Sequence, residues 1–260
     1  MRVGVLGASG KMGRLVCAAV DAERDLELVA AVNPSLAGQP LAPLVGMSHG
    51  ELRISGSADA LLEAEAEVAV DFTTPDAVMA NVRYCVDHGI NTVVGTTGIG
   101  PDEQDQIRKW VGEEREVGVI VAPNFSVGAV LAQRLAEDAA RFFHAAEIVE
   151  LHHEQKADAP SGTAAATARR IASAREEAWK GPTGGEEFRG GDVEGIRIHS
   201  VRLPGLVAHQ EVIFGAQGQI LTIRHDASDR SCYLPGVLLA IRSVDDRPGL
   251  TVGLEPLLGL

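Results

Sequence analysis

The sequence predicts an α/β protein with a doubly wound parallel sheet, followed by a smaller α+β part with a mixed sheet. Two observations support this fold class. Over residues 1–121, short apolar runs alternate with helical patterns, which is typical of a parallel sheet. Over residues 196–225, three strand patterns follow one another directly, which indicates antiparallel or mixed pairing.

The first part consists of strand and helix patterns in alternation. Strands are predicted at residues 3–6, 26–32, 68–72, 91–94 and 117–121, with helices through residue 22, over residues 74–88 and from residue 101. Pro75 and Pro101 favour helix starts, and Gly89 is a typical helix stop. Residues 35–57, rich in Pro, Gly and Ser, are predicted to be irregular.

The pattern changes after residue 126. A long helix to Phe143, a strand at residues 146–151 and an Ala-rich helix opened by residues 160–163 come first, followed by strands at residues 196–203, 207–216 and 219–225. Residues 181–195 contain six glycines and predict a mobile loop. A final helix (234–243) and strand (250–254) are expected to rejoin the first domain. The predicted domains are therefore residues 1–124 with 231–260, and residues 125–230.

Composition restricts the classes of partner. The formal net charge of −13 argues against nucleic acid or an anionic membrane surface. Cys17, Cys85 and Cys232 are far apart and have no metal-ligand spacing, so we expect no metal site and a reducing compartment. No signal peptide or membrane-spanning run is visible. These features predict a cytoplasmic protein.

A glycine-rich turn joins the first strand to the first helix. Gly7, Gly10 and Gly13 follow the strand at a spacing that differs by one position from the usual dinucleotide-binding fingerprint. Such glycines permit a tight turn, close approach to a pyrophosphate and close packing of the helix. Glycines also mark ordinary strand-to-helix turns, but their place in the first strand–helix unit favours a Rossmann-type nucleotide site.

Three further segments bear on that cofactor. Asn33 ends the second strand, where a carboxylate would bind the ribose of NAD and repel a 2′-phosphate. Asn has no such repulsion, and Lys11 and Arg14 are near in sequence, so NADPH should be tolerated. Residues 95–97 and 122–125 end later strands, and either contacts to the cofactor or ordinary turn chemistry explains them equally well.

The most informative segment is residues 147–164, EIVELHHEQKADAPSGTA. A buried strand ends in His152 and His153, Lys156 follows, and a Ser-Gly-Thr helix start comes next. The strand end supplies proton-transfer groups, and the helix start supplies N–H groups that hold anions. A solvated strand end is the alternative for any one of these residues. Their combination favours a site for an anionic substrate.

With these segments in view, the sequence resembles the dihydrodipicolinate reductases of bacterial lysine and diaminopimelate biosynthesis, also called 4-hydroxy-tetrahydrodipicolinate reductases. The resemblance runs from end to end. The segments that carry it are residues 7–13 (GASGKMG), 71–73 (DFT), 94–98 (VGTTG), 122–126 (APNFS) and 147–164. Many members of the family have an acidic residue at position 33, so Asn33 leaves the cofactor preference open.

The resemblance implies reduction to tetrahydrodipicolinate, with NADH or NADPH as cofactor and a small anionic dicarboxylate as substrate. It makes His152 a proton donor or acceptor and Lys156 a proton donor, with His153, Gly162 and Thr163 holding the substrate carboxylates. The implied cofactor-binding residues are Gly7, Ala8, Ser9, Gly10, Lys11, Met12, Asn33, Gly95, Thr96, Thr97, Ala122, Pro123, Asn124 and Phe125.

The resemblance also implies how the molecule is organised. Residues 1–124 with 231–260 would bind the dinucleotide, and residues 125–230 would bind substrate and form a homotetramer. The two domains would be joined by hinges and close over their ligands. Two alternatives remain: another two-domain dehydrogenase, and an NAD(P)-binding sensor without catalysis. The first would have to explain the His-His-x-x-Lys and Ser-Gly-Thr pattern by coincidence, and the second would bind cofactor without turnover.

Overall fold

A computed structural model describes residues 1–47, 50–112, 116–175 and 188–260. It contains two compact units. Unit 1 comprises Met1–Ser126 with Tyr233–Leu260, and unit 2 comprises Val127–Cys232. The sequence placed the corresponding boundaries at residues 124 and 230. Each unit has its own sheet and its own core, and we describe each unit by itself.

Unit 1 is built on a six-stranded sheet in which every pair of neighbouring strands is parallel. Its strands, in spatial order, are β11 (Gly249–Val252), β5 (Gly118–Val121), β4 (Asn91–Val94), β3 (Val68–Asp71), β1 (Arg2–Leu6) and β2 (Glu27–Val32). The central strands β3, β4 and β5 are buried along their whole length, as expected of a sheet covered on both faces. The predicted doubly wound parallel sheet is confirmed.

The helices of unit 1 begin and end largely where the sequence signals place them. They are α1 (Lys11–Ala22), the 3₁₀ turn η1 (Pro34–Leu36), α2 (Ala42–Val45), α3 (Asp59–Glu63), α4 (Pro75–Asp87), α5 (Pro101–Val111), α8 (Leu234–Ser243) and α9 (Glu255–Leu258). Pro75 and Pro101 each occupy the first helical position. The region predicted to be irregular contains the short elements η1 and α2.

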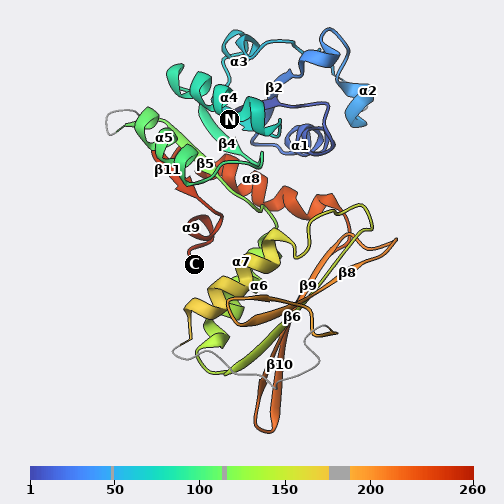
Figure 1. Ribbon diagram of the computed structural model, residues 1–260. Helices are drawn as coiled ribbons and strands as arrows, with labels where there is room; N and C mark the ends of the chain where they lie inside the picture. The colour runs from blue at the N-terminus through green and yellow to red at the C-terminus, as the bar shows by residue number, and fades with distance from the viewer. Residues whose placement is uncertain (48–49, 113–115, 176–187) are drawn as a thin grey trace. The chain divides into compact units, whose positions relative to one another are not determined.

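The C-terminal tail supplies an edge strand of the sheet of unit 1. β11 pairs in parallel with β5, with Leu250 opposite Val119 and Thr251 opposite Ile120. The unit is thus discontinuous in sequence. Figure 1 shows the tail in red beside the green strand β5.

Unit 2 contains a five-stranded mixed sheet. Its strands, in spatial order, are β10 (Gln219–Ala227), β9 (Ala208–Ala216), β6 (Ala145–His152), β8 (Ile196–Arg202) and β7 (Gly191–Val193). β6 runs parallel to β8 and antiparallel to β9, so the predicted mixed sheet is confirmed. Helices α6 (Val127–Ala140) and α7 (Gly162–Ser173) lie together on one face of this sheet (Figure 1).

The alternation of side chains along β6 determines what faces the helices. Ala146, Ile148 and Glu150 are buried, whereas Glu147 and Val149 are only partly buried on the other face. Ala146 and Ile148 belong to a core with residues of α6, α7, β8 and β9. The third inward position is therefore a carboxylate, Glu150, which is 0% exposed.

One predicted loop is partly a strand. Gly191–Val193 forms β7, which pairs antiparallel with β8, where the sequence predicted a mobile loop over residues 181–195. The glycines favoured the loop, but Gly195 supplies the positive φ of +82° that the turn between these two strands needs. Residues 181–187 of that loop lie outside the described residues. No helix in the described part of the chain is long and apolar enough to cross a membrane.

Candidate active site

The glycine-rich turn of unit 1 requires glycine at two of its three positions. Gly7 has a φ of +79°, and a Cβ there would collide with the carbonyl oxygen of Phe72. A Cβ at Gly13 would collide with the carbonyl oxygen of Gly7. Helix α1 therefore starts directly against the turn, and its first N–H groups lack intrahelical acceptors. This is the cradle that a dinucleotide pyrophosphate requires.

The other predicted residues of this turn form its wall. Ala8 is fully buried, Ser9 and Met12 are partly buried, and Lys11 is exposed at the start of α1. Gly10 occupies the N-cap position and has no capping side chain, so the helix start is unobstructed. Arg14 donates from Nε to the carbonyl oxygen of Ser9 at 2.7 Å. Two cations, Lys11 and Arg14, thus lie on the first turn of α1.

Asn33 lies directly after β2, at the carboxyl edge of the sheet, and its side chain is engaged locally. Its Oδ1 accepts hydrogen bonds from the backbone N–H of Ser35 at 3.0 Å and from the Ser35 hydroxyl at 2.6 Å. The amide oxygen is therefore tied into the η1 turn. The amide N–H₂ group is a donor that suits a ribose hydroxyl or a 2′-phosphate oxygen.

A buried carboxylate organises the next two loops at this edge. Asp71 is 0% exposed, and its Oδ1 accepts from the Thr96 hydroxyl at 2.6 Å, the Thr73 hydroxyl at 2.7 Å and the Thr73 N–H at 2.9 Å. Asn81 donates to Oδ2 at 2.8 Å. The side chain of Thr96 is thus occupied within the protein. Of the predicted segment 95–97, the backbone and the exposed Thr97 are what a cofactor could contact.

Residues 122–125 divide in the same way. Ala122 is buried and its N–H binds the Val94 carbonyl oxygen at 3.1 Å, whereas Pro123 is exposed. Asn124 caps the following turn by accepting from the N–H of Ser126 at 2.9 Å. Phe125 is 3% exposed, and its ring centroid lies 5.9 Å from that of Phe72. Phe125 therefore packs in the core, against Phe72.

In unit 2, the end of β6 holds a histidine against the buried carboxylate. His152 Nδ1 lies 2.5 Å from Oε2 of Glu150. Arg202, at the end of the neighbouring strand β8, donates from Nη1 to Oε2 at 2.9 Å and from Nη2 to Oε1 at 2.8 Å. The guanidinium and the carboxylate thus form a bidentate ion pair beside the imidazole.

Burial and pairing set the protonation of these groups. Burial pushes the pKa of Glu150 upward, but hydrogen bonds from Arg202, Ser200 and His152 outweigh it and leave the pKa below its ordinary value. Burial is also the largest effect on His152 and lowers its pKa, which the bond to Glu150 only partly offsets. Glu150 is therefore ionised, and the His152 imidazole is neutral near pH 7.

The loop after β6 carries the predicted lysine. The Nζ atom of Lys156 lies 2.8 Å and 2.9 Å from the two carboxylate oxygens of Asp158. Hydrogen bonds to Lys156 lower the pKa of Asp158, so this carboxylate stays ionised beside the ammonium. The N–H of Lys156 binds the carbonyl oxygen of His153 at 3.1 Å. His153 itself is partly buried at the strand end.

Helix α7 starts beside the same loop. The Ser161 hydroxyl caps the helix by accepting from the N–H of Ala164 at 3.1 Å. The N–H groups of Gly162 and Thr163 belong to the first turn and have no intrahelical acceptors. A Cβ at Gly162 would meet no atom within 4 Å, so the space beside this helix start is open. These features suit an anion such as a carboxylate.

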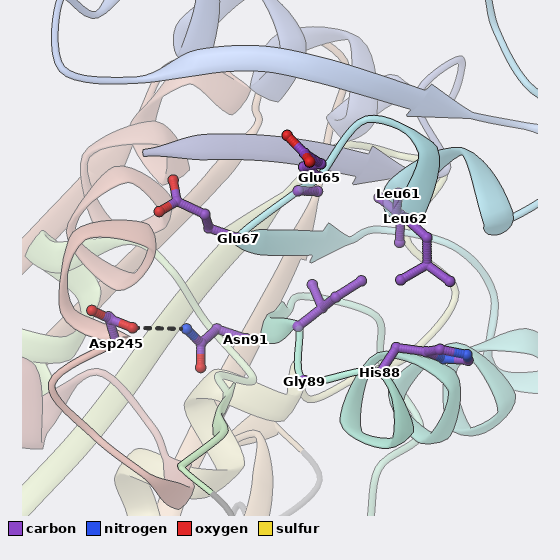
Figure 2. A pocket seen from close by; sticks show the side chains of 10 residues that line it. Leu61, Leu62, Glu65, Glu67, His88, Gly89, Asn91 and Asp245 are labelled. Carbon is purple, nitrogen blue, oxygen red and sulfur yellow. Dashed lines mark hydrogen bonds between the residues drawn. The ribbon is translucent and has the colours of Figure 1, made fainter.

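A pocket of about 410 Å³ lies elsewhere in unit 1. Figure 2 shows it where β3 and β4 begin, lined by Glu65, Glu67, His88 and Asp245, with Asn91 bonded to Asp245. This is the opposite edge of the sheet from Gly7 and Asn33, and the acidic lining disfavours cofactor phosphates.

In the described residues, no group of three or more His, Cys, Asp or Glu side chains is arranged to hold a metal ion.

Comparison with known proteins assigns the family. The model described as the N-terminus of dihydrodipicolinate reductase matches residues 1–125, and the C-terminal model matches residues 128–258. The chain belongs to the dihydrodipicolinate reductase family. It is accordingly an NAD(P)H-dependent oxidoreductase, and the sequence-based predictions of family, fold class and enzyme class are confirmed.

Named relatives match over the whole chain. The 4-hydroxy-tetrahydrodipicolinate reductase of Nocardia farcinica (strain IFM 10152) is 52% identical, over 100% of this chain and 99% of its own length. That of Mycobacterium sp. (strain KMS) is 50% identical, over 100% of both chains. Similarity of this extent to named reductases favours the reductase over a non-catalytic sensor or another dehydrogenase.

Solved structures agree. The dipicolinate-bound dihydrodipicolinate reductase from Paenisporosarcina sp. TG-14 has a TM-score of 0.87 and 38% identity, and covers 98% of both chains. The scyllo-inositol dehydrogenase from Lactobacillus casei has a TM-score of 0.62 at 9% identity, over 99% of this chain and 92% of that chain, and shows the fold alone.

The sequence missed two residues of this site. Glu150 lies within the segment singled out by the sequence and Arg202 contacts it, but neither was a candidate. Glu150 could have been found from the alternation Ala146, Ile148, Glu150, which places a carboxylate on the buried face. Arg202 had no local signal, because its 52-residue separation from Glu150 is closed only by the pairing of β6 with β8.

Proposed function

We propose that this chain reduces 4-hydroxy-tetrahydrodipicolinate, by way of dihydrodipicolinate, to tetrahydrodipicolinate with NADH or NADPH. The observation that carries the proposal is the set of groups at the start of α7: a neutral imidazole, an ammonium and exposed helix N–H groups within one loop of unit 2. A relative of known structure is described as dipicolinate-bound, and dipicolinate is a small dicarboxylate.

The substrate carboxylates require donors, and unit 2 offers them in one place. We assign one carboxylate to the N–H groups of Gly162 and Thr163, where the positive end of the α7 dipole favours an anion. His153, at the end of β6, supplies a further donor. A chain with a net charge of −13 needs such local donors to hold a dianion.

Proton transfer falls to His152 and Lys156. Reduction of a conjugated imine leaves negative charge on nitrogen or carbon, which a nearby acid must protonate. The bound cofactor supplies the hydride. The neutral imidazole of His152 takes up a proton when the dianionic substrate binds, since nearby negative charge favours the imidazolium, and returns it to the reduced substrate. The ammonium of Lys156 stabilises the developing charge.

A coupled assay tests the function. Oxidation of NADH and of NADPH is followed at about 340 nm, where the reduced nicotinamide absorbs. The substrate is formed in the cuvette from pyruvate and aspartate semialdehyde by the preceding synthase. We expect oxidation that depends on the synthase. Cofactor binding without any turnover would contradict the proposal and favour a sensor.

Position 33 should influence the choice of cofactor. Asn33→Asp places a carboxylate at the end of β2, which favours the ribose hydroxyls of NADH and repels the 2′-phosphate of NADPH. We expect the ratio of kcat/KM for NADH to that for NADPH to rise by roughly 10-fold, about 1.4 kcal/mol. Ser35→Ala is the control, because it removes a partner of Asn33 without adding charge. An unchanged ratio would mean that position 33 does not contact the ribose.

We further propose that unit 2 forms a homotetramer through the open face of its sheet. Val149, Leu151, Val201 and Ile213 are only partly buried on β6, β8 and β9, and the helices of the described part of unit 2 pack on the opposite face. A partly apolar sheet face of this kind suits a partner copy. Light scattering should give about four times the chain mass of 27.3 kDa, and a monomer mass would contradict the assembly.

We also propose that the protein works in the cytoplasm. Cys17, Cys85 and Cys232 form no disulfide, and burial raises the pKa of the Cys17 and Cys85 thiols to about 12. Such thiols suit a reducing compartment. Cell fractionation with an antibody against the chain tests this assignment.

A further inference from the structure

We propose that Glu150 and Arg202 are positioning residues that hold His152 in one tautomer and tie it to the loop of Lys156. This inference deepens the proposed function, since it assigns a support for the proton-transfer group of that reaction. Neither residue needs to touch the substrate. They act through His152 and through the backbone of residues 156–161.

The hydrogen bonds around Glu150 determine which imidazole nitrogen carries the proton. Oε2 accepts from Arg202 at 2.9 Å and lies 2.5 Å from His152 Nδ1, while Oε1 accepts from Arg202 at 2.8 Å and from the N–H of Ser161 at 3.3 Å. An ionised carboxylate can only accept, so Nδ1 must bear the hydrogen. Nε2 is then the nitrogen available for proton transfer in neutral His152.

Arg202 connects this carboxylate to the rest of the site. Besides its two bonds to Glu150, it donates from Nε to the carbonyl oxygen of Lys156 at 3.3 Å and from Nη2 to that of Asp158 at 2.7 Å. The N–H of Ser161, the residue that caps α7, also binds Glu150. The imidazole, the loop that carries Lys156 and the start of α7 are thus all bonded to one ion pair, whose carboxylate is buried.

Burial and the neighbouring charged groups together set the charge on His152. The charged groups around the imidazole are Glu150 on its own strand, Arg202 on β8 and Lys156 in the following loop, and on β9 its neighbour is Ala208. Burial is the largest effect on the pKa of His152 and lowers it, Glu150 raises it in part, and Lys156 and Arg202 add smaller lowering effects. The resting imidazole is therefore neutral and is free to take up a proton with the substrate.

Glu150→Gln is the first test. The amide cannot accept from both Arg202 and His152 as the carboxylate does, so the imidazole loses its fixed tautomer. We expect kcat to fall by roughly 10- to 100-fold, with the substrate KM and the NADH dissociation constant within about threefold of wild type. The limb of the pH–rate profile due to His152 should move to lower pH, because the carboxylate that favours the imidazolium is gone.

Glu147→Gln is the matched control. Glu147 is on the same strand and also contacts a histidine and an arginine, His199 and Arg189, but on the opposite face of the sheet. We expect its kcat and pH profile to match wild type, with the oligomer mass checked in both variants. A folded Glu150→Gln enzyme with wild-type kcat and pH profile would overturn the inference.

A second measurement needs no change to the ion pair. Nitrogen-15 NMR of the wild-type enzyme, with the His152 signals assigned by their loss in His152→Gln, reports which imidazole nitrogen is protonated. We expect Nδ1–H and an unprotonated Nε2 at pH 8. The opposite tautomer, or rapid exchange between the two, would overturn the inference even if Glu150→Gln fails to fold. Absence of wild-type turnover would instead contradict the proposed function and leave the NMR result interpretable.

Discussion

His152→Ala is expected to lower kcat by roughly 10²- to 10⁴-fold, the range typical of the loss of a general acid or base. The imidazole is the titratable group that the end of β6 holds against a buried carboxylate, and alanine leaves no proton carrier there. Dissociation constants for NADH and NADPH, measured by fluorescence titration, should change by less than about twofold, since the glycine-rich turn belongs to unit 1.

The control for this variant is His199→Ala. His199 also lies on a strand of unit 2, and its Nε2 is 2.8 Å from Oε2 of Glu147, so it resembles His152 in its partner. Unlike His152, it is not followed by a loop with a lysine and a helix start in the described part of the chain. We expect its kcat to stay within about twofold of wild type. Unchanged turnover in a folded His152→Ala enzyme would remove the role assigned to His152.

The dependence of wild-type kcat/KM on pH should also show the titration of His152. Burial lowers the pKa of His152, and the bond to Glu150 offsets this only in part. A group whose folded pKa lies below its unfolded value binds fewer protons in the folded state. The limb of kcat/KM that belongs to His152 should therefore lie below pH 6.5, the ordinary value for histidine. It should be absent from His152→Ala.

Local signals account for the part of this fold that the sequence predicted. The strands of unit 1 are short apolar runs, and the helix starts are marked by Pro75 and Pro101, so each strand–helix unit could be placed from its own residues. Gly195 shows the limit of that approach. Glycine permits both a mobile loop and a tight strand turn, and the pairing of β7 with β8 decides between them.

The site residues also differ in whether local sequence signals or strand pairing reveal them. His152, Lys156 and Gly162 fall within eleven consecutive residues, so their combination could be seen in the sequence. Arg202 reaches Glu150 only because β8 pairs with β6, and no spacing rule connects positions 52 residues apart. Thr96 illustrates the reverse case. It stays a predicted cofactor contact through its backbone, whereas the bond from its hydroxyl to Asp71 is visible only in the folded network.

Gly13→Ala is expected to reduce both stability and cofactor binding. The new methyl group would collide with the carbonyl oxygen and carbon of Gly7 and with the Cα of Ala8, all of them backbone atoms that cannot rotate away. Either α1 moves away from β1 or the turn deforms. Overpacking of this kind costs about 1–3 kcal/mol in the free energy of unfolding. We expect a lower Tm in calorimetry and NADH affinity weakened by roughly 10-fold or more.

Gly191→Ala distinguishes this effect from the general cost of replacing a glycine. A Cβ at Gly191 would meet no atom within 4 Å, and the residue lies on the exposed strand β7 of unit 2. We expect its free energy of unfolding to stay within about 0.5 kcal/mol of wild type. If Gly13→Ala bound NADH as well as Gly191→Ala does, the close approach of α1 to the turn would not be what forms the pyrophosphate site. Loss of binding in Gly13→Ala alone, with the fold retained, would assign the site to this turn.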